Sequence, residues 1–180
     1  MNVLCYVPNI IGYFRAACLV VAAIAFDTAP LFHLSYSLNF LLDGVDGFAA
    51  RYFNQVSRFG YCLDMILDRV GNALLYAKLT HICCKPVWMI LMFIDISSHW
   101  FMTLSTQEHK KQTNAWIKFY YAHLGLICFG NELFLINLTW NGGNPYLFAS
   151  SLAPFFFKQC INVMQLGISV NTLANTKNIF

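Results

Sequence analysis

Charged side chains are scarce in this 180-residue sequence. Asp, Glu, Lys and Arg together make up only 11% of it, hydrophobic residues make up 58%, and the mean hydropathy is +0.56. Ordinary soluble domains carry about 25% charged residues, so this composition excludes a soluble globular protein. The 11 basic residues exceed the 8 acidic ones by three and are scattered along the chain. This argues against nucleic acid as the main partner, since nucleic-acid binding requires clustered basic residues.

The sequence also lacks the cysteine spacings of disulfide frameworks and zinc sites. Its seven cysteines are an odd number, most of them lie in apolar segments, and Cys83 and Cys84 are adjacent rather than arranged as C-x-x-C. A structural zinc site needs two pairs of Cys or His ligands at short spacing. We therefore interpret the cysteines as small hydrophobic residues.

Long apolar segments predict an all-α protein with six transmembrane helices in one membrane domain, residues 1–180. A spanning helix needs about 20 apolar residues, and the chain is long enough for six. The first begins at Pro8, because proline is tolerated in the opening turn of a helix. A secretory signal peptide over Val7–Phe26 is the alternative, but Arg15 interrupts it and no basic segment precedes it. The other spans are expected at Leu34–Tyr52, Phe59–Cys83, Pro86–Leu104, Trp116–Trp140 and Leu147–Ser169.

The distribution of Lys and Arg predicts that both termini face the cytoplasm, because positive residues are enriched in cytoplasmic connections. In this orientation the outer connections contain only Lys85. The inner connections contain Arg51, Arg58, Lys110, Lys111, Lys118 and Lys177. The residues Asn-Gly-Gly-Asn-Pro at 141–145 predict a turn between the fifth and sixth spans.

Four of the eight acidic residues lie close together in otherwise apolar segments. Asp43 and Asp46 are three residues apart, and Asp64 and Asp68 are four apart, so each pair lies on one face of its helix. Carboxylates inside a membrane are unfavourable unless they face a cavity or a cation. Two antiparallel helices would bring the four together, and oxygen ligands favour Mg²⁺ or Mn²⁺. We therefore expect two divalent ions, an arrangement suited to displacement at phosphorus.

The alternative interpretation of these acids is a set of salt bridges at the membrane surface, with Arg51, Arg58 and Arg69 as partners. Small residues such as Gly47, Ala50 and Gly60 lie between the acidic pairs. They favour either a ligand close to the helix backbone or close packing of helices. Arg51 and Ser57 add a cation and a hydroxyl, which suit a phosphate.

The spacing of these residues matches a known signature. Residues Asp43–Asp68 fill all eight positions of D-x2-D-G-x2-A-R-x8-G-x3-D-x3-D, and the chain thereby resembles the CDP-alcohol phosphatidyltransferases. The segments Val7–Arg15, Asp95–Trp100 and Gly130–Phe134 resemble the eukaryotic members that use inositol. The resemblance extends from about residue 7 to residue 137.

This resemblance implies a six-helix enzyme, usually a homodimer, in the endoplasmic reticulum membrane with its site facing the cytoplasm. It implies transfer of the phosphatidyl group from CDP-diacylglycerol to myo-inositol, giving phosphatidylinositol and CMP in phospholipid biosynthesis. By motif position, the metal ligands would be Asp43, Asp46, Asp64 and Asp68, with Asp68 also the catalytic base. The residues that contact CDP-diacylglycerol would be Gly47, Arg51 and Ser57.

Two other functions remain open. The same core could use another acceptor alcohol, such as glycerol phosphate, serine or a diacylglycerol. A phosphate-bearing acceptor would favour clustered basic residues near the acids, where the sequence offers few beyond Lys118 and Lys158. A cation channel or transporter would use the four acids as an ion path, but Arg51 beside them would repel the permeant ion.

A few polar residues outside the motif have more than one interpretation. Asp95 and His99 lie on one helix face and would bond each other, bind inositol or join a buried polar network. Lys158 would pair with Glu132 across helices, or contact a phosphate or the inositol hydroxyls. The stretch Ala122–Gly125 departs from the family pattern and is a few residues shorter than expected. Such a deletion rotates the rest of a helix by about 100° per residue.

Overall fold

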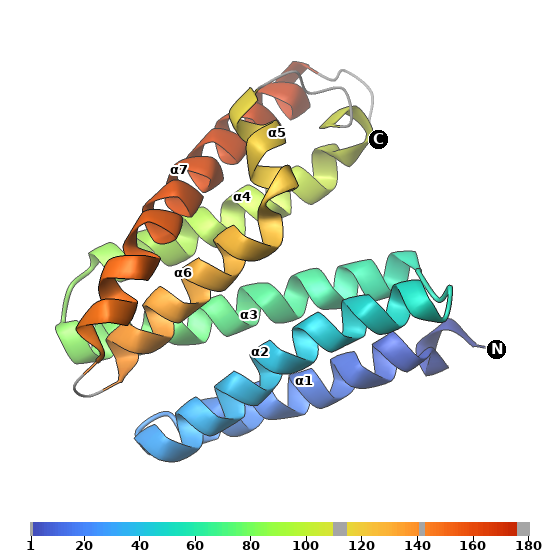
Figure 1. Cartoon of the computed structure of the whole chain (residues 1–180). Coiled ribbons are helices and arrows are strands. Elements are labelled where there is room, and N and C mark those ends of the chain that lie inside the picture. Colours follow the sequence, from blue (N-terminus) through green and yellow to red (C-terminus); the bar gives the residue numbers. More distant parts are fainter. Residues whose placement is uncertain (1, 110–114, 141–142, 176–180) are drawn as a thin grey trace. The chain divides into compact units, whose positions relative to one another are not determined.

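The computed structural model describes residues 2–109, 115–140 and 143–175, and these residues contain helices but no strand (Figure 1). The expectation of an all-α protein is confirmed. The helices are η1 (Val3–Cys5), α1 (Val7–Ile24), α2 (Ala29–Tyr52), α3 (Arg58–Cys83), α4 (Val87–His109), α5 (Ala115–Ala122), α6 (Leu124–Thr139) and α7 (Pro145–Asn175). Lys110, Lys111, Lys177 and part of the expected 141–145 turn lie outside the described residues. The chain forms two compact units, residues 1–78 and 79–180.

In the first unit, α1 and α2 run side by side along most of their length (Figure 1). Each begins with a proline in its first turn, where the missing N–H group has no helical partner to lose. For this reason α2 starts at Ala29, five residues before the expected Leu34, and it ends at the expected Tyr52. The third helix of the unit, α3, packs against α1 where Gly12 leaves room for Leu63. A Cβ atom at Gly12 would lie 2.8 Å from Leu63 Cδ2.

A short connection turns the chain from α2 into α3. Asn54 has a φ of 53°, a left-handed conformation that asparagine adopts more readily than most residues. The side-chain oxygen of Gln55 accepts a hydrogen bond from the Val7 N–H group at 2.8 Å, which ties the connection to the start of α1. Ser57 Oγ accepts a hydrogen bond from the Gly60 N–H group at 3.0 Å, as N-cap residues do. The turn therefore returns α3 alongside α2.

The second unit is built around α7, which contacts both α4 and α6. Phe134 and Phe155 stack with ring centroids 4.3 Å apart, and both are buried. Gly130 packs against Pro154, so that a Cβ atom at Gly130 would lie 2.6 Å from Pro154 Cβ. Small and aromatic side chains together bring α6 close to α7.

The fifth span expected over Trp116–Trp140 is not one continuous helix. The chain forms α5 and α6 there, whose axes differ by 79°. The break is at His123, whose φ of −119° and ψ of 21° are not helical. Gly125 lies two residues beyond the break and lowers the local helix propensity. The break lies within the stretch Ala122–Gly125, where a departure from the family pattern is expected from the sequence.

The exposed surface is that of a membrane protein. Phe14, Ile24 and Leu126 are 63%, 83% and 71% exposed, and many other large apolar side chains are exposed as well. An apolar surface of this extent is typical of lipid contact. Among the described residues, α1 and the Val87–Ser105 part of α4 are long and apolar enough to cross a bilayer, and α5 with α6 make a third candidate if counted as one bent span. Because α2, α3 and α7 carry more polar side chains, the count of six spans stays a prediction.

Candidate active site

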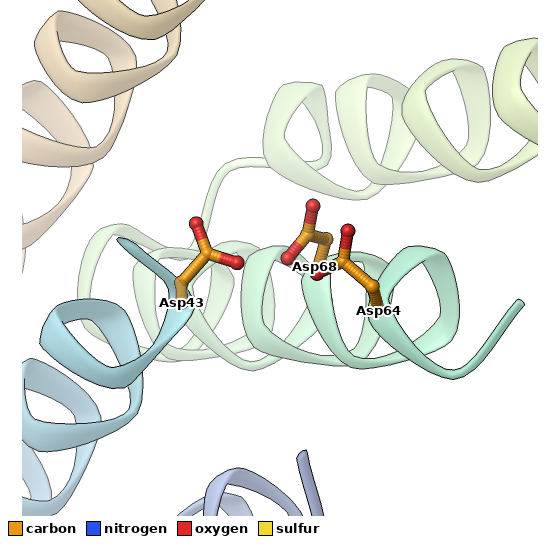
Figure 2. Close-up of side chains that lie close together, drawn as sticks. All are labelled: Asp43, Asp64 and Asp68. Carbon is orange, nitrogen blue, oxygen red and sulfur yellow. The ribbon is translucent and has the colours of Figure 1, made fainter. Parts of the chain in front are cut away.

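The two acidic pairs meet between α2 and α3. Asp43 projects from α2, and Asp64 and Asp68 project from α3 into the same space (Figure 2). One carboxylate oxygen from each of these three residues lies within 4.8 Å of the others. The helical spacing places each pair on one face, and the turn between the helices makes the faces meet. Asp46 is outside this group of three.

Arg15 of α1 binds all four carboxylates. Its Nη1 atom lies 2.6 Å from Asp46 Oδ2 and 2.7 Å from Asp64 Oδ1. Its Nη2 atom lies 2.7 Å from Asp43 Oδ1 and 2.7 Å from Asp68 Oδ1. Each terminal nitrogen therefore joins one carboxylate of α2 to one of α3.

The salt-bridge interpretation of the acids named other partners. Of the three arginines that it proposed, Arg69 makes one long contact with the acids, with Nη2 3.8 Å from Asp68 Oδ2. The short contacts come instead from Arg15. In the sequence, Arg15 counted against a signal peptide and ended the family-like segment Val7–Arg15, but it was not expected at the site. A single arginine in an otherwise apolar span was the signal that this residue is functional, because intramembrane charges require a partner.

Three of the four carboxylates are partly exposed, although Arg15 is buried. The Arg15 side chain is 1% exposed, whereas those of Asp43, Asp64 and Asp68 are 38%, 47% and 36% exposed. Four carboxylates and one guanidinium leave a net negative charge, which attracts cations. An oxygen-only donor set of this kind suits hard divalent ions. Asp43, Asp64 and Asp68 could thus hold a metal ion.

A cavity of about 240 Å³ lies beside the carboxylates, within the first unit. Asp46 and Asp64 form part of its lining, and so do all three residues expected to contact CDP-diacylglycerol, namely Gly47, Arg51 and Ser57. Pro8, Asn9, Gly12 and Gln55 also line it, and sequence reasoning did not single these out as site residues. The cavity therefore combines a cation, a hydroxyl and two carboxylates with an apolar wall.

Two glycines shape the cavity. A Cβ atom at Gly47 would lie 3.7 Å from both terminal nitrogens of Arg51, so the guanidinium group folds back over this glycine. A Cβ atom at Gly60 would lie 2.8 Å from Asn9 Oδ1 and 3.1 Å from Ser57 Oγ. Small residues here were expected to allow either close packing or a ligand near the helix backbone. Close packing accounts for Gly60, whereas Gly47 is not closely packed and has room for a side chain.

The second unit contains a separate buried polar cluster. Lys158 Nζ lies 3.0 Å from Asp95 Oδ1, and both side chains are almost fully buried. Asn162 Nδ2 donates to the same carboxylate oxygen at 2.9 Å. Lys158 therefore pairs with Asp95, a partner outside the alternatives that the sequence offered for it. His99 Nδ1 lies 2.8 Å from the Asp95 backbone oxygen, so Asp95 and His99 both belong to this buried polar cluster.

Comparison with known proteins agrees with the geometry. The family model described as CDP-alcohol phosphatidyltransferase matches residues 5–144. CDP-diacylglycerol–inositol 3-phosphatidyltransferase 1 of Arabidopsis thaliana is 35% identical, with 92% of this chain and 87% of that protein covered. The Homo sapiens CDP-diacylglycerol–inositol 3-phosphatidyltransferase is 36% identical over 85% of this chain and 75% of its own length.

The Saccharomyces cerevisiae CDP-diacylglycerol–inositol 3-phosphatidyltransferase is 32% identical over 97% of this chain and 88% of its own length. No solved structure matches this chain. The family match covers α1, α2 and α3, and hence the whole carboxylate cluster and its cavity. The chain belongs to the CDP-alcohol phosphatidyltransferase family.

Proposed function

We propose that this protein transfers the phosphatidyl group of CDP-diacylglycerol to myo-inositol, producing phosphatidylinositol and CMP. The observation that carries the proposal is the carboxylate cluster of α2 and α3, which opens beside a cavity lined by Arg51 and Ser57. The choice of inositol is supported by relatives that are named for this acceptor and match most of the chain.

The metal ligands are Asp43, Asp46, Asp64 and Asp68, and the site takes two Mg²⁺ or Mn²⁺ ions. Three of these carboxylates already offer oxygens within 4.8 Å of one another. Asp46 lines the cavity, so it is suited to bind a metal ion that also contacts the substrate. Bound divalent ions would neutralise the diphosphate and stabilise the charge that develops on its oxygens.

The headgroup of CDP-diacylglycerol occupies the cavity. The Arg51 guanidinium lies over Gly47, where it offers a planar pair of donors to a phosphate. Ser57 adds a hydroxyl at the start of α3. The cavity volume of about 240 Å³ suits part of a nucleotide headgroup, and the acyl chains stay in the bilayer.

Asp68 accepts the proton of the attacking inositol hydroxyl. Its side chain is 36% exposed, so an acceptor can reach it. The hydroxyl oxygen forms a bond to the phosphorus that carries diacylglycerol, and the bond from that phosphorus to the CMP oxygen breaks. CMP leaves with the electron pair. No covalent enzyme intermediate is required, because positioning and charge stabilisation suffice for such a displacement.

Location and assembly follow from the family resemblance. We place the enzyme in the endoplasmic reticulum membrane with its site open to the cytoplasm, which agrees with the bias of Lys and Arg toward the cytoplasmic connections. A homodimer is the expected assembly and stays a prediction.

The decisive experiment supplies the purified protein, in lipid nanodiscs, with CDP-diacylglycerol and Mn²⁺ and offers inositol, serine, glycerol phosphate or water. We expect CMP release and formation of a new lipid when inositol is the acceptor, and neither with the other three acceptors. Turnover with serine or glycerol phosphate instead would reassign the acceptor, and no CMP release with any acceptor would contradict the proposal.

The same assay tests the catalytic base. Asp68→Asn should reduce turnover by about 10²-fold or more, as expected for a positioned general base, while CDP-diacylglycerol binding falls much less. Asp27→Asn, which changes an exposed acid in the turn before α2, is the matched control. An unchanged rate in the Asp68 variant would exclude this role.

A further inference from the structure

Arg15 contacts five polar side chains at once. A guanidinium carries five N–H groups in a fixed plane, four of them on Nη1 and Nη2. Nη1 donates hydrogen bonds to Asp46 and Asp64, and Nη2 donates one to Asp68, all at 2.6–2.7 Å. Nη2 also forms an ion pair with Asp43 Oδ1 at 2.7 Å. The fifth, on Nε, lies 3.5 Å from Asn39 Oδ1. No other residue type offers four coplanar donors that could join the four acids at once.

Arg15 approaches the carboxylates from the buried side. Its contacts are made with one oxygen of each acid: Asp43 Oδ1, Asp46 Oδ2, Asp64 Oδ1 and Asp68 Oδ1. The side chains of the three acids that form the compact group are 36–47% exposed, whereas the Arg15 side chain is 1% exposed.

This arrangement separates two tasks within one cluster. One oxygen of each acid lies against the guanidinium, and the exposed part of Asp43, Asp64 and Asp68 stays available for divalent ions. Without a cation between them, four carboxylates on neighbouring helices would repel one another and push α2 away from α3. A cation fixed behind them lowers this repulsion and sets the spacing of the outer oxygens before any ion arrives.

We propose that Arg15 is a positioning residue for the metal site: it stays bound behind the four carboxylates and holds them at the spacing that divalent ions require. The proposal rests on the metal assignment in the proposed function. Its rival is that Arg15 occupies the place of the metal and must leave when an ion binds. The two alternatives differ in whether Arg15 still contacts the carboxylates once a metal ion is bound.

Arg15→Lys tests the positioning role of the guanidinium independently of its charge, because lysine keeps the positive charge but lacks the planar set of donors. Mn²⁺ binding to the purified, EDTA-stripped full chain is measured by electron paramagnetic resonance without substrate. Partners that orient metal ligands typically contribute 10–100-fold to metal affinity, and we expect a loss of about this size. Arg58→Lys, the same exchange at an exposed position at the start of α3, is the control and should bind Mn²⁺ as the parent does. Parental or tighter Mn²⁺ binding by Arg15→Lys would overturn the proposal.

A second measurement needs no variant at Arg15 and decides the question if that variant fails to fold. The chain contains four arginines, so protein labelled with ¹⁵N-arginine and carrying Arg51→Lys and Arg69→Lys retains Arg15 as the labelled residue near the cluster. Electron–nuclear double resonance of bound Mn²⁺ should then show a weak coupling to ¹⁵N. Absence of this coupling would mean that Arg15 has left, which overturns the proposal.

Asp43→Asn distinguishes the two possible failures. If Mn²⁺ binding is lost in Asp43→Asn but unchanged in Arg15→Lys, the metal assignment stands and the positioning role is wrong. If Mn²⁺ binds equally well to the Asp43 variant, the metal assignment itself fails.

Discussion

Asp43→Asn should make the metal-free protein more stable while removing its response to metal. In the structure, Asp43 Oδ1 lies 2.7 Å from Arg15 Nη2, an attraction of about 4 kcal/mol for charge centres ~4 Å apart at an effective dielectric constant of about 20. Carboxylate oxygens of Asp64 and Asp68 lie within 4.8 Å of an Asp43 oxygen. Each of these repulsions is about 3–4 kcal/mol on the same scale.

Repulsion at Asp43 therefore exceeds attraction by roughly 3 kcal/mol before screening. Because the side chain is 38% exposed, solvent reduces the difference, and we expect a net gain of about 1 kcal/mol. The asparagine side chain keeps an oxygen acceptor beside Arg15 Nη2, so little is lost in the exchange. A gain of this size raises Tm by roughly 2–4 °C for a chain of this length.

Metal should have the opposite effect on the two proteins. An ion present at 100 times its dissociation constant stabilises the parent by about 2.7 kcal/mol. The Asp43 variant, which lacks one of the three close ligands, should show little of this gain and no phosphatidyl transfer. Thermal unfolding in nanodiscs, in EDTA and in Mn²⁺, measures both effects, with Asp27→Asn as the control. A lower Tm in EDTA, or a parental Mn²⁺ shift, would refute the electrostatic reasoning.

Three further substitutions test the cavity and the second unit. Arg51→Lys keeps the charge but loses the planar fork and should weaken use of CDP-diacylglycerol several-fold with little change in the inositol KM; kinetics like those of the parent would exclude a phosphate-binding role. Gly60→Ala places a Cβ atom 2.8 Å from Asn9 Oδ1 and should lower stability by about 1–3 kcal/mol and raise the KM for CDP-diacylglycerol, which thermal unfolding and kinetics check. Lys158→Met removes the ammonium partner of the buried Asp95 carboxylate and should destabilise the protein by about 3–5 kcal/mol; if the double change Asp95→Leu with Lys158→Met is no more stable than the single one, the ion-pair argument fails.

The class of protein and the acidic pairs could be predicted from the sequence because both depend on local information. Composition alone excludes a soluble domain, and the three- and four-residue spacing of the acids places each pair on one helix face regardless of how the helices pack. The bounds of α3 came within one residue of the expected span at its start and matched it at its end. The signature at Asp43–Asp68 and its substrate residues Gly47, Arg51 and Ser57 lie in one contiguous segment, so the chain's turn suffices to gather them around the cavity.

Only the tertiary structure decided which groups from distant segments meet. Arg15 is 28–53 residues from the acids it binds, and Lys158 is 63 residues from Asp95. From the sequence alone, each charged side chain had several possible partners, because any two helices of the chain could pack together. The packing of the folded helices selects one partner for each. The break at His123 has the same origin, because an apolar segment of suitable length is compatible with one straight helix or with two that pack separately. Periodicity and spacing determine which residues share a helix face, whereas the partner across the interface depends on how complete helices fit together.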